Sequence, residues 1–202
     1  MRRGIHQSRI LFDMMTDFPK VSIRADGFLM LSILVFFTET PVLCSLVGNV
    51  LIHELGHLYL LRRYGVYIRR LSVGFSGLCI QCSLERLPRR AYFLCAAAGP
   101  MMGLSAAFFC SVIGNVFHRD FLLLFAGTGV ILSLFNLMPV KPLDGWRMLV
   151  AVSPRIAPIV SDLVAIIVLL VGLAMMYKGF GVALACMGVF FLLQKRTEAF
   201  FA

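Results

Sequence analysis

Residues 49–61 read NVLIHELGHLYLL, which places two histidines and a glutamate in an otherwise apolar segment. Ionisable residues inside a membrane span are costly, and they usually face a bundle interior or a water-filled cavity. His53 and His57 are four residues apart, so on a helix their imidazoles project from one face and can bind a single cation. Glu54 completes an HExxH pattern, in which a metal-activated water lies beside a carboxylate base. The segment predicts a metal site within a membrane helix.

The composition is typical of an integral membrane protein. Of the 202 residues, 60% are hydrophobic and 14% are charged, and the mean hydropathy is +0.91. Soluble domains are far more polar, so we predict one all-α polytopic membrane domain over residues 1–202. It would comprise a tail (1–27), a core with the HExxH segment (28–148) and C-terminal helices (149–202). Its six cysteines lie mostly in apolar stretches and are interpreted as core residues.

Six apolar runs predict about six transmembrane helices. They cover residues 28–37, 42–61, 92–113, 121–138, 157–177 and 179–193. An upright span needs about 20 residues, so the first run would require flanking residues or a thinned membrane. We place a tight turn at Glu39 and Pro41 between the first two runs. One long kinked segment is the alternative.

The region between the second and third runs is polar and strand-like. Residues 66–75 and 78–84 predict a small β-hairpin that turns at Ser76 and Gly77. Cys79 and Cys82 have the spacing of a metal-binding pair. Because no second pair or histidine lies nearby, we interpret them as strand residues.

The basic residues set the predicted orientation. Residues 1–27 lack the apolar core of a signal peptide and are predicted to be a cytoplasmic tail. Of the 19 Lys and Arg residues, all but Arg119 and Lys178 fall in regions that six spans place on the side of this tail. The positive-inside rule makes that side cytoplasmic and explains the net charge of +9 without nucleic acid. The histidine pair then lies toward the cytoplasmic side.

A second polar motif follows the fourth run, where residues 136–146 read NLMPVKPLDGW. Its two prolines break the helix, and irregular backbone at membrane depth is tolerated where it is buried in protein or lines a cavity. Asp144 alone could be the N-cap of a short helix over residues 145–152. Its predicted depth matches that of the histidine pair, which favours a shared metal site.

Together these motifs resemble the site-2 protease family of intramembrane zinc metalloproteases over residues 28–148. The resemblance rests on HELGH, on the Ala-Gly-Pro at residues 98–100 and on NLMPVKPLDG. The site residues that it implies are the ligands of one zinc ion, His53, His57 and Asp144, the catalytic base Glu54, and the substrate-site residues Asn136 and Pro139. The strand-bearing loop after the HExxH span is also similar to the family.

The chain is most similar to the short, sporulation-type branch, because it has no PDZ-like insertion. Two features depart from the family pattern. Gly103 stands where many members have asparagine, so a polar contact in the third span is not expected. No CBS domain follows the last predicted span, so nucleotide-linked regulation is not expected either. Gly99 and Gly103 are interpreted first as helix-packing residues.

The resemblance implies hydrolysis of a peptide bond in or near a transmembrane segment, with zinc-activated water and Glu54 as general base. The expected partners are the lipid bilayer, a membrane-bound substrate and a regulatory membrane protein. We expect an unwound substrate segment to pair with an edge of the hairpin. A non-cleaving relative that binds membrane segments is the alternative, which the intact Glu54 opposes. A transporter is disfavoured because neither internal duplication nor charges in several spans are seen.

Overall fold

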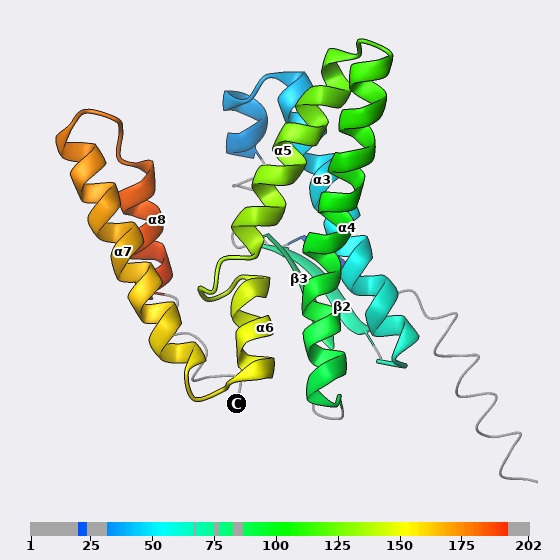
Figure 1. Cartoon of the computed structure of the whole chain (residues 1–202), viewed down its shortest axis with the longest axis vertical. Helices are drawn as coiled ribbons and strands as arrows, with labels where there is room; N and C mark the ends of the chain where they lie inside the picture. Colours follow the sequence, from blue (N-terminus) through cyan, green and yellow to red (C-terminus); the bar gives the residue numbers. More distant parts are fainter. Residues whose placement is uncertain (1–19, 24–31, 67, 75–76, 83–86, 194–202) are drawn as a thin grey trace, which may run out of the picture. The chain divides into compact units, whose positions relative to one another are not determined.

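The computed structural model describes residues 20–23, 32–66, 68–74, 77–82 and 87–193 (Figure 1). The chain divides into two compact units, one within residues 1–39 and 61–86 and the other within residues 40–60 and 87–202. Much of the predicted tail, and residues 28–31 of the first predicted span, lie outside the described residues.

The first unit contains a three-stranded sheet. Strand β2 (Ile68–Gly74) pairs antiparallel with β3 (Gly77–Cys82), in the region where the sequence predicts a hairpin. Strand β1 (Lys20–Ile23) pairs parallel with β2 on its other side. The sheet therefore has one strand more than predicted. This strand falls in the segment predicted as a cytoplasmic tail, and its four residues are too few to show an alternating pattern.

The second unit is helical (Figure 1). Its helices are α3 (Thr40–Arg63, whose last turn belongs to the first unit), α4 (Arg89–Val116), α5 (Asp120–Asn136), α6 (Asp144–Val152), α7 (Ala157–Tyr177) and α8 (Ala183–Leu193). Helix α4 contacts α5 and α6, and α7 contacts α8.

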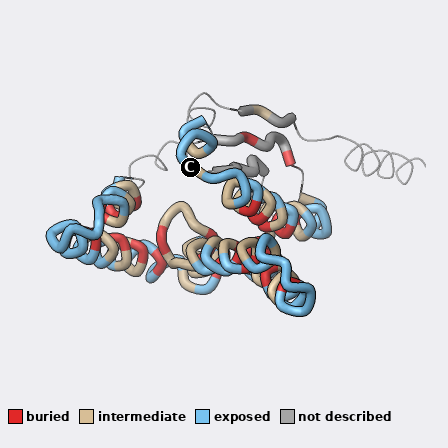
Figure 2. The backbone as a smooth tube through the Cα atoms, turned by 90° about the horizontal axis from the view of Figure 1, so that it is seen from above, coloured by how far each residue is buried: buried red, intermediate tan, exposed pale blue. Residues whose placement is uncertain are grey.

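Three of the described helices, α3, α4 and α7, are long and apolar enough to cross a membrane. Helices α5 and α8 are apolar but have 17 and 11 residues. Large apolar side chains such as Phe108, Ile131 and Leu170 are more than half exposed. Exposed residues recur along the helices, interspersed with buried ones (Figure 2). Such surfaces suit lipid rather than water. The chain has the architecture of a multi-pass membrane protein, with three of the six predicted spans at full length.

Helices α3, α4 and α5 approach closely because their facing residues are small. The buried residues of α4 are Ala91, Cys95, Ala96, Gly99, Pro100, Gly103, Ala107 and Gly114, and those of α5 are Ala126, Gly129 and Ser133. A Cβ atom at Gly56 of α3 would lie 2.5 Å from the carbonyl oxygen of Ala98 in α4. Small residues allow this approach in lipid, where dispersion contacts and hydrogen bonds hold helices together.

The loop between α5 and α6 is anchored in the interior. Val140 is fully buried and belongs to an apolar cluster with Ala165 of α7 and Phe191 of α8. The backbone N–H of Lys141 donates to the hydroxyl of Ser161 in α7 at 3.2 Å. These contacts hold the segment that leads into Asp144, the first residue of α6.

Candidate metal centre

Helix α3 presents its two histidines on a single buried face. The side chains of His53 and His57 are one turn apart, and their ring centroids are separated by 4.9 Å. The two residues are only 5% and 6% exposed. Burial of two imidazoles is costly unless their nitrogens have partners. The HExxH spacing therefore produces the side-by-side arrangement that the sequence predicts.

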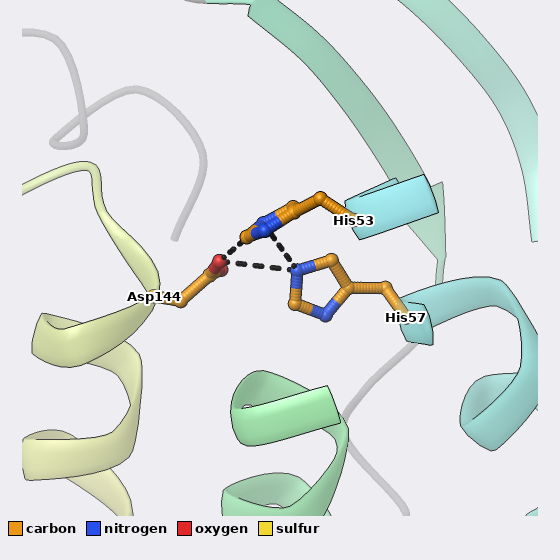
Figure 3. Close-up of side chains that lie close together, drawn as sticks. All are labelled: His53, His57 and Asp144. Carbon is orange, nitrogen blue, oxygen red and sulfur yellow. Dashed lines mark hydrogen bonds and ion pairs between the residues drawn. The ribbon is translucent and has the colours of Figure 1, made fainter. Parts of the chain in front are cut away.

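Asp144 meets this histidine pair from the start of α6 (Figure 3). Its Oδ2 lies 2.9 Å from Nε2 of His53 and 3.1 Å from Nε2 of His57, and the two Nε2 atoms are 3.2 Å apart. Asp144 is itself the first residue of the helix, and the N-cap residue is Leu143. The alternative that Asp144 is only an N-cap is therefore wrong. Residues about 90 positions apart in the chain converge on one point.

The three donor atoms have the geometry of a metal site. In a tetrahedral zinc site with ligands at about 2.0–2.1 Å, ligand atoms are about 3.3 Å apart. The observed separations of 2.9, 3.1 and 3.2 Å are close to that value. Two imidazole nitrogens and a carboxylate oxygen are also a donor set that zinc prefers. The cluster of His53, His57 and Asp144 fits one zinc ion.

Helix α4 supports this cluster from its backbone. Nδ1 of His57 donates to the carbonyl oxygen of Cys95 at 2.7 Å, so a neutral ring held in this way would offer the lone pair of Nε2 to a metal. A Cβ atom at Gly99 would lie 2.7 Å from Nε2 of His53 and would also clash with Nε2 of His57. The side-chain-free backbone at Gly99 thus makes room for both ligand atoms. For Nδ1 of His53, no hydrogen-bond partner is found within the described part of the chain.

Asp144 is held as a carboxylate, the form that binds a metal. Burial alone would raise its pKa, but hydrogen bonds with His53 and His57 and the positive charge of Arg147 outweigh that cost. The pKa of the Asp144 carboxyl therefore lies well below its usual range. Nη1 of Arg147 lies 3.3 Å from Oδ1, whereas both histidines contact Oδ2.

Glu54, the predicted catalytic base, is half-buried on α3 directly after His53. Its carboxylate lies within electrostatic range of His53, His57 and Asp144. Glu54 is not one of the three residues of the cluster, and its role as general base stays a prediction.

Asn136 and Pro139, the predicted substrate-site residues, lie outside the three-atom cluster. Asn136 ends α5, and its amide donates to the carbonyl of Leu132 in the same helix at 3.0 Å. Pro139 is half-buried in the loop that follows. Their part in substrate binding stays a prediction.

Two supporting residues were missed by sequence reasoning. The carbonyl of Cys95 has no sequence signal, because every residue carries the same group. Gly99 did carry a signal, since it belongs to the Ala-Gly-Pro of residues 98–100, but its spacing from Gly103 favoured a packing interpretation.

Comparison with known proteins identified related metalloproteases, although no family model matches the chain. The chain is 29% identical over 143 residues to zinc metalloprotease MJ0392 of Methanocaldococcus jannaschii, an alignment that covers 63% of this chain and 41% of that protein. It is 30% identical over 174 residues to putative zinc metalloprotease Rip3 of Mycobacterium tuberculosis, which covers 76% of this chain and 44% of that protein. The chain therefore spans less than half the length of these relatives.

A solved structure shows the same fold. The site-2 protease from Methanocaldococcus jannaschii superposes with a TM-score of 0.67 and 19% identity, over 91% of this chain and 93% of that one. The chain thus has the fold of a site-2 protease. The named relatives are zinc metalloproteases, and the solved structure shares the fold of this chain.

Proposed function

We propose that this chain is an intramembrane zinc metalloprotease of the site-2 protease family, which hydrolyses a peptide bond in or near a transmembrane segment of a membrane-bound substrate. The observation that carries the proposal is the convergence of His53, His57 and Asp144 with donor atoms 2.9–3.2 Å apart. The fold of a site-2 protease and the similarity to named zinc metalloproteases support it.

His53, His57 and Asp144 would hold one zinc ion per chain. Three protein ligands are typical of catalytic zinc sites, which keep their fourth position open. A bound zinc ion acidifies a water molecule to a pKa of about 7 and polarises a carbonyl group. The protein's part is to keep the ligands oriented, which the hydrogen bond to the Cys95 carbonyl does for His57.

Glu54 acts as the general base and then as the general acid. Its carboxylate oxygen takes a proton from the attacking water and delivers it to the nitrogen of the leaving amine. Its place beside the ligands on α3 supports this role, since proton transfer requires hydrogen-bond reach. The same residue argues against the alternative of a relative that binds membrane segments without cutting them.

The substrate must unwind before cleavage, because a helical peptide bond hides its carbonyl in the helix. We propose that the unwound segment pairs with a strand edge of the sheet. In the order β1-β2-β3, both edges of β2 are occupied, and the outer edges of β1 and β3 are left. We take β3 (Gly77–Cys82) as the candidate because it belongs to the predicted hairpin. Asn136 and Pro139 are proposed to shape the substrate site.

Single proline substitutions along β3 test the pairing. Proline removes a backbone donor, so those at outward-facing N–H groups should slow cleavage while leaving zinc content unchanged. A series of such variants that all cleave at the wild-type rate would exclude β3 as the docking edge.

The proposal extends to topology and setting. The whole chain forms one catalytic domain with six spans, both termini in the cytoplasm and the metal centre toward the cytoplasmic side of the cell membrane. The distribution of Lys and Arg supports this orientation. The lack of a PDZ-like insertion supports a sporulation-type role, with a regulatory membrane protein as partner.

The first test is the zinc content of detergent-purified protein. Wild type and Glu54→Gln should each hold about one zinc per chain, because Glu54 is not a ligand. Asp144→Ala should lose most of its zinc, whereas Asp120→Ala, which changes an exposed carboxylate at the start of α5, should keep it. A wild type that neither holds nor takes up zinc would overturn the proposal.

The second test is cleavage of single-span reporter proteins. Wild type should release a product and Glu54→Gln should not, since loss of a general base costs about 10²–10⁴-fold in rate. If wild type holds zinc, captures reporters and cleaves none of them, the non-cleaving alternative is supported instead.

A further inference from the structure

One buried polar residue of α3 has no part in the metal centre described above. Asn49 lies one turn before His53, on the helix face that carries both histidines. Only 1% of its surface is exposed. Polar side chains in membrane helices are rare and usually face the bundle interior, where they serve a function. The hydrogen-bond partners of Asn49 indicate what its function is.

The side chain of Asn49 ties α3 to α5. Its Nδ2 donates to the carbonyl of Phe125 and to the hydroxyl of Thr128, both at 3.0 Å, and to the carbonyl of Ser45 in its own helix. The hydroxyl of Ser45, which is fully buried, bonds to the same Thr128 hydroxyl. We refer to Ser45, Asn49, Phe125 and Thr128 as the α3–α5 clamp.

The clamp stands beside small residues of α4 and α5, and the ring of Phe125 packs against Gly48 of α3 at the same level. A Cβ atom at Gly129 of α5 would lie 2.5 Å from Oδ1 of Asn49 and 3.2 Å from Cβ of Ala107 in α4. Small neighbours of this kind provide close approach but few interdigitating side chains. Hydrogen bonds are directional, so here they define the rotation and axial register of α3 against α5.

A contribution to folding stability alone does not explain why an asparagine occupies position 49. Its Oδ1 is buried, and none of the described residues supplies a hydrogen-bond donor to it. A buried amide oxygen without a partner is destabilising, and an apolar side chain of similar size would avoid that cost. Local rules of this kind are broken most often at functional sites.

Of the two helices that the clamp joins, α3 carries two of the three ligands and α5 precedes the loop that leads to the third. Helix α3 carries His53 and His57, and α5 leads through the loop anchored by Val140 to Asp144. Metal ligands must be held within about 0.5 Å and 10–20° of their working geometry. We propose that Asn49 is a positioning residue, which sets the rotation and register of α3 so that both histidines meet Asp144. This inference rests on the proposed metal centre.

Zinc affinity, measured by chelator competition on the full-length purified chain, tests the inference. Asn49→Leu should bind zinc about 10–100-fold more weakly than wild type, the effect typical of losing a supporting contact to metal ligands. Its melting temperature without metal should stay near that of wild type, because the orphaned amide oxygen is removed too. The visible spectrum of the cobalt-loaded variant should change, since ligand geometry changes.

Asn115→Leu is the matched control. Among the described residues, Asn115 donates only to the carbonyl of Ser111 within α4, at 2.8 Å, and its side chain is exposed. The same substitution there should leave zinc affinity and the cobalt spectrum unchanged. Equal zinc affinity and identical cobalt spectra for Asn49→Leu and wild type would overturn the inference.

Thr128→Val provides a second, milder variant in case Asn49→Leu does not fold. It removes one acceptor of Asn49 and the partner of Ser45, while the Phe125 carbonyl remains. Zinc should bind more weakly, by less than in Asn49→Leu. A folded Thr128→Val with wild-type affinity would also overturn the inference. If wild type itself takes up no zinc, the proposed function fails, and the positioning role falls with it.

Discussion

Two helix interfaces of the second unit differ in whether they bury polar side chains. One lies between α7 and α8, and the other lies between α3 and its neighbours. Helices α7 and α8 meet through small and apolar residues: a Cβ atom at Gly172 would lie 2.6 Å from Cα of Ala185, and one at Gly188 would lie 2.5 Å from Cα of Leu169. The interface of α3 with its neighbours is equally close, yet its buried face carries Asn49 and the two ligand histidines.

This difference separates the requirements of folding from those of function. Small residues are sufficient to bring helices together in lipid, as α7 and α8 show. The described buried residues of α8 are Ala185, Gly188 and Phe191, with no polar side chain among them. Buried polar groups on α3 are therefore not needed for packing as such. They mark the part of the bundle that holds the metal centre.

Of the substitutions that test this difference, Gly99→Ala should have the largest effect on zinc affinity. Its new Cβ would occupy the space of both histidine Nε2 atoms, so the ligands must move. Zinc affinity should fall by about 10–100-fold or more, and the cleavage rate should fall with it. Chelator competition and a reporter assay measure the two effects.

Gly127→Ala is the control for that change, because a Cβ at residue 127 of α5 meets no atom within 4 Å. It should bind zinc like wild type. If Gly99→Ala also retains wild-type affinity, Gly99 serves packing alone and the two interfaces are alike.

Gly172→Ala should lower the stability of the protein without changing its zinc affinity. The added methyl group pushes α7 away from the backbone of α8, which costs about 1–3 kcal/mol of stability by overpacking. The melting temperature should fall, while zinc affinity at a temperature where the variant is folded should stay unchanged. A loss of zinc affinity without a loss of stability would show that the α7–α8 interface also shapes the metal centre.

The local part of the metal centre could be predicted from the sequence. The spacing of His53 and His57 needs only helical periodicity to place both rings on one face. The neighbouring Glu54 follows from the same pattern. Asp144 required a further step, because its distance from the histidines in the chain conceals the contact. The predicted depth of Asp144 in the membrane matches that of the histidines, which indicated that they meet. The structure brings the three residues together.

The contacts that support the ligands could not be predicted in this way. The partners of Asn49 lie 76 and 79 residues away and include a backbone carbonyl, so no local pattern indicates them. The hydrogen bond from His57 to the Cys95 carbonyl is invisible for the same reason. Strand β1 depends on pairing with β2, about 50 residues later, and not on its own four residues.

Arg147→Gln should have the smallest effect on the metal centre. Nη1 of Arg147 lies 3.3 Å from Oδ1 of Asp144, but the arginine side chain is 46% exposed, so solvent screens the pair. Exposed ion pairs contribute about 1 kcal/mol or less, which limits the expected loss of zinc affinity to about fivefold. Chelator competition should therefore rank Arg147→Gln below Asn49→Leu, although Arg147 forms an ion pair with a ligand and the hydrogen bonds of Asn49 go to Ser45, Phe125 and Thr128. The reverse order would mean that direct charge at Asp144 matters more than the register of α3 against α5, and the polar face of α3 would then be no more than another packing surface.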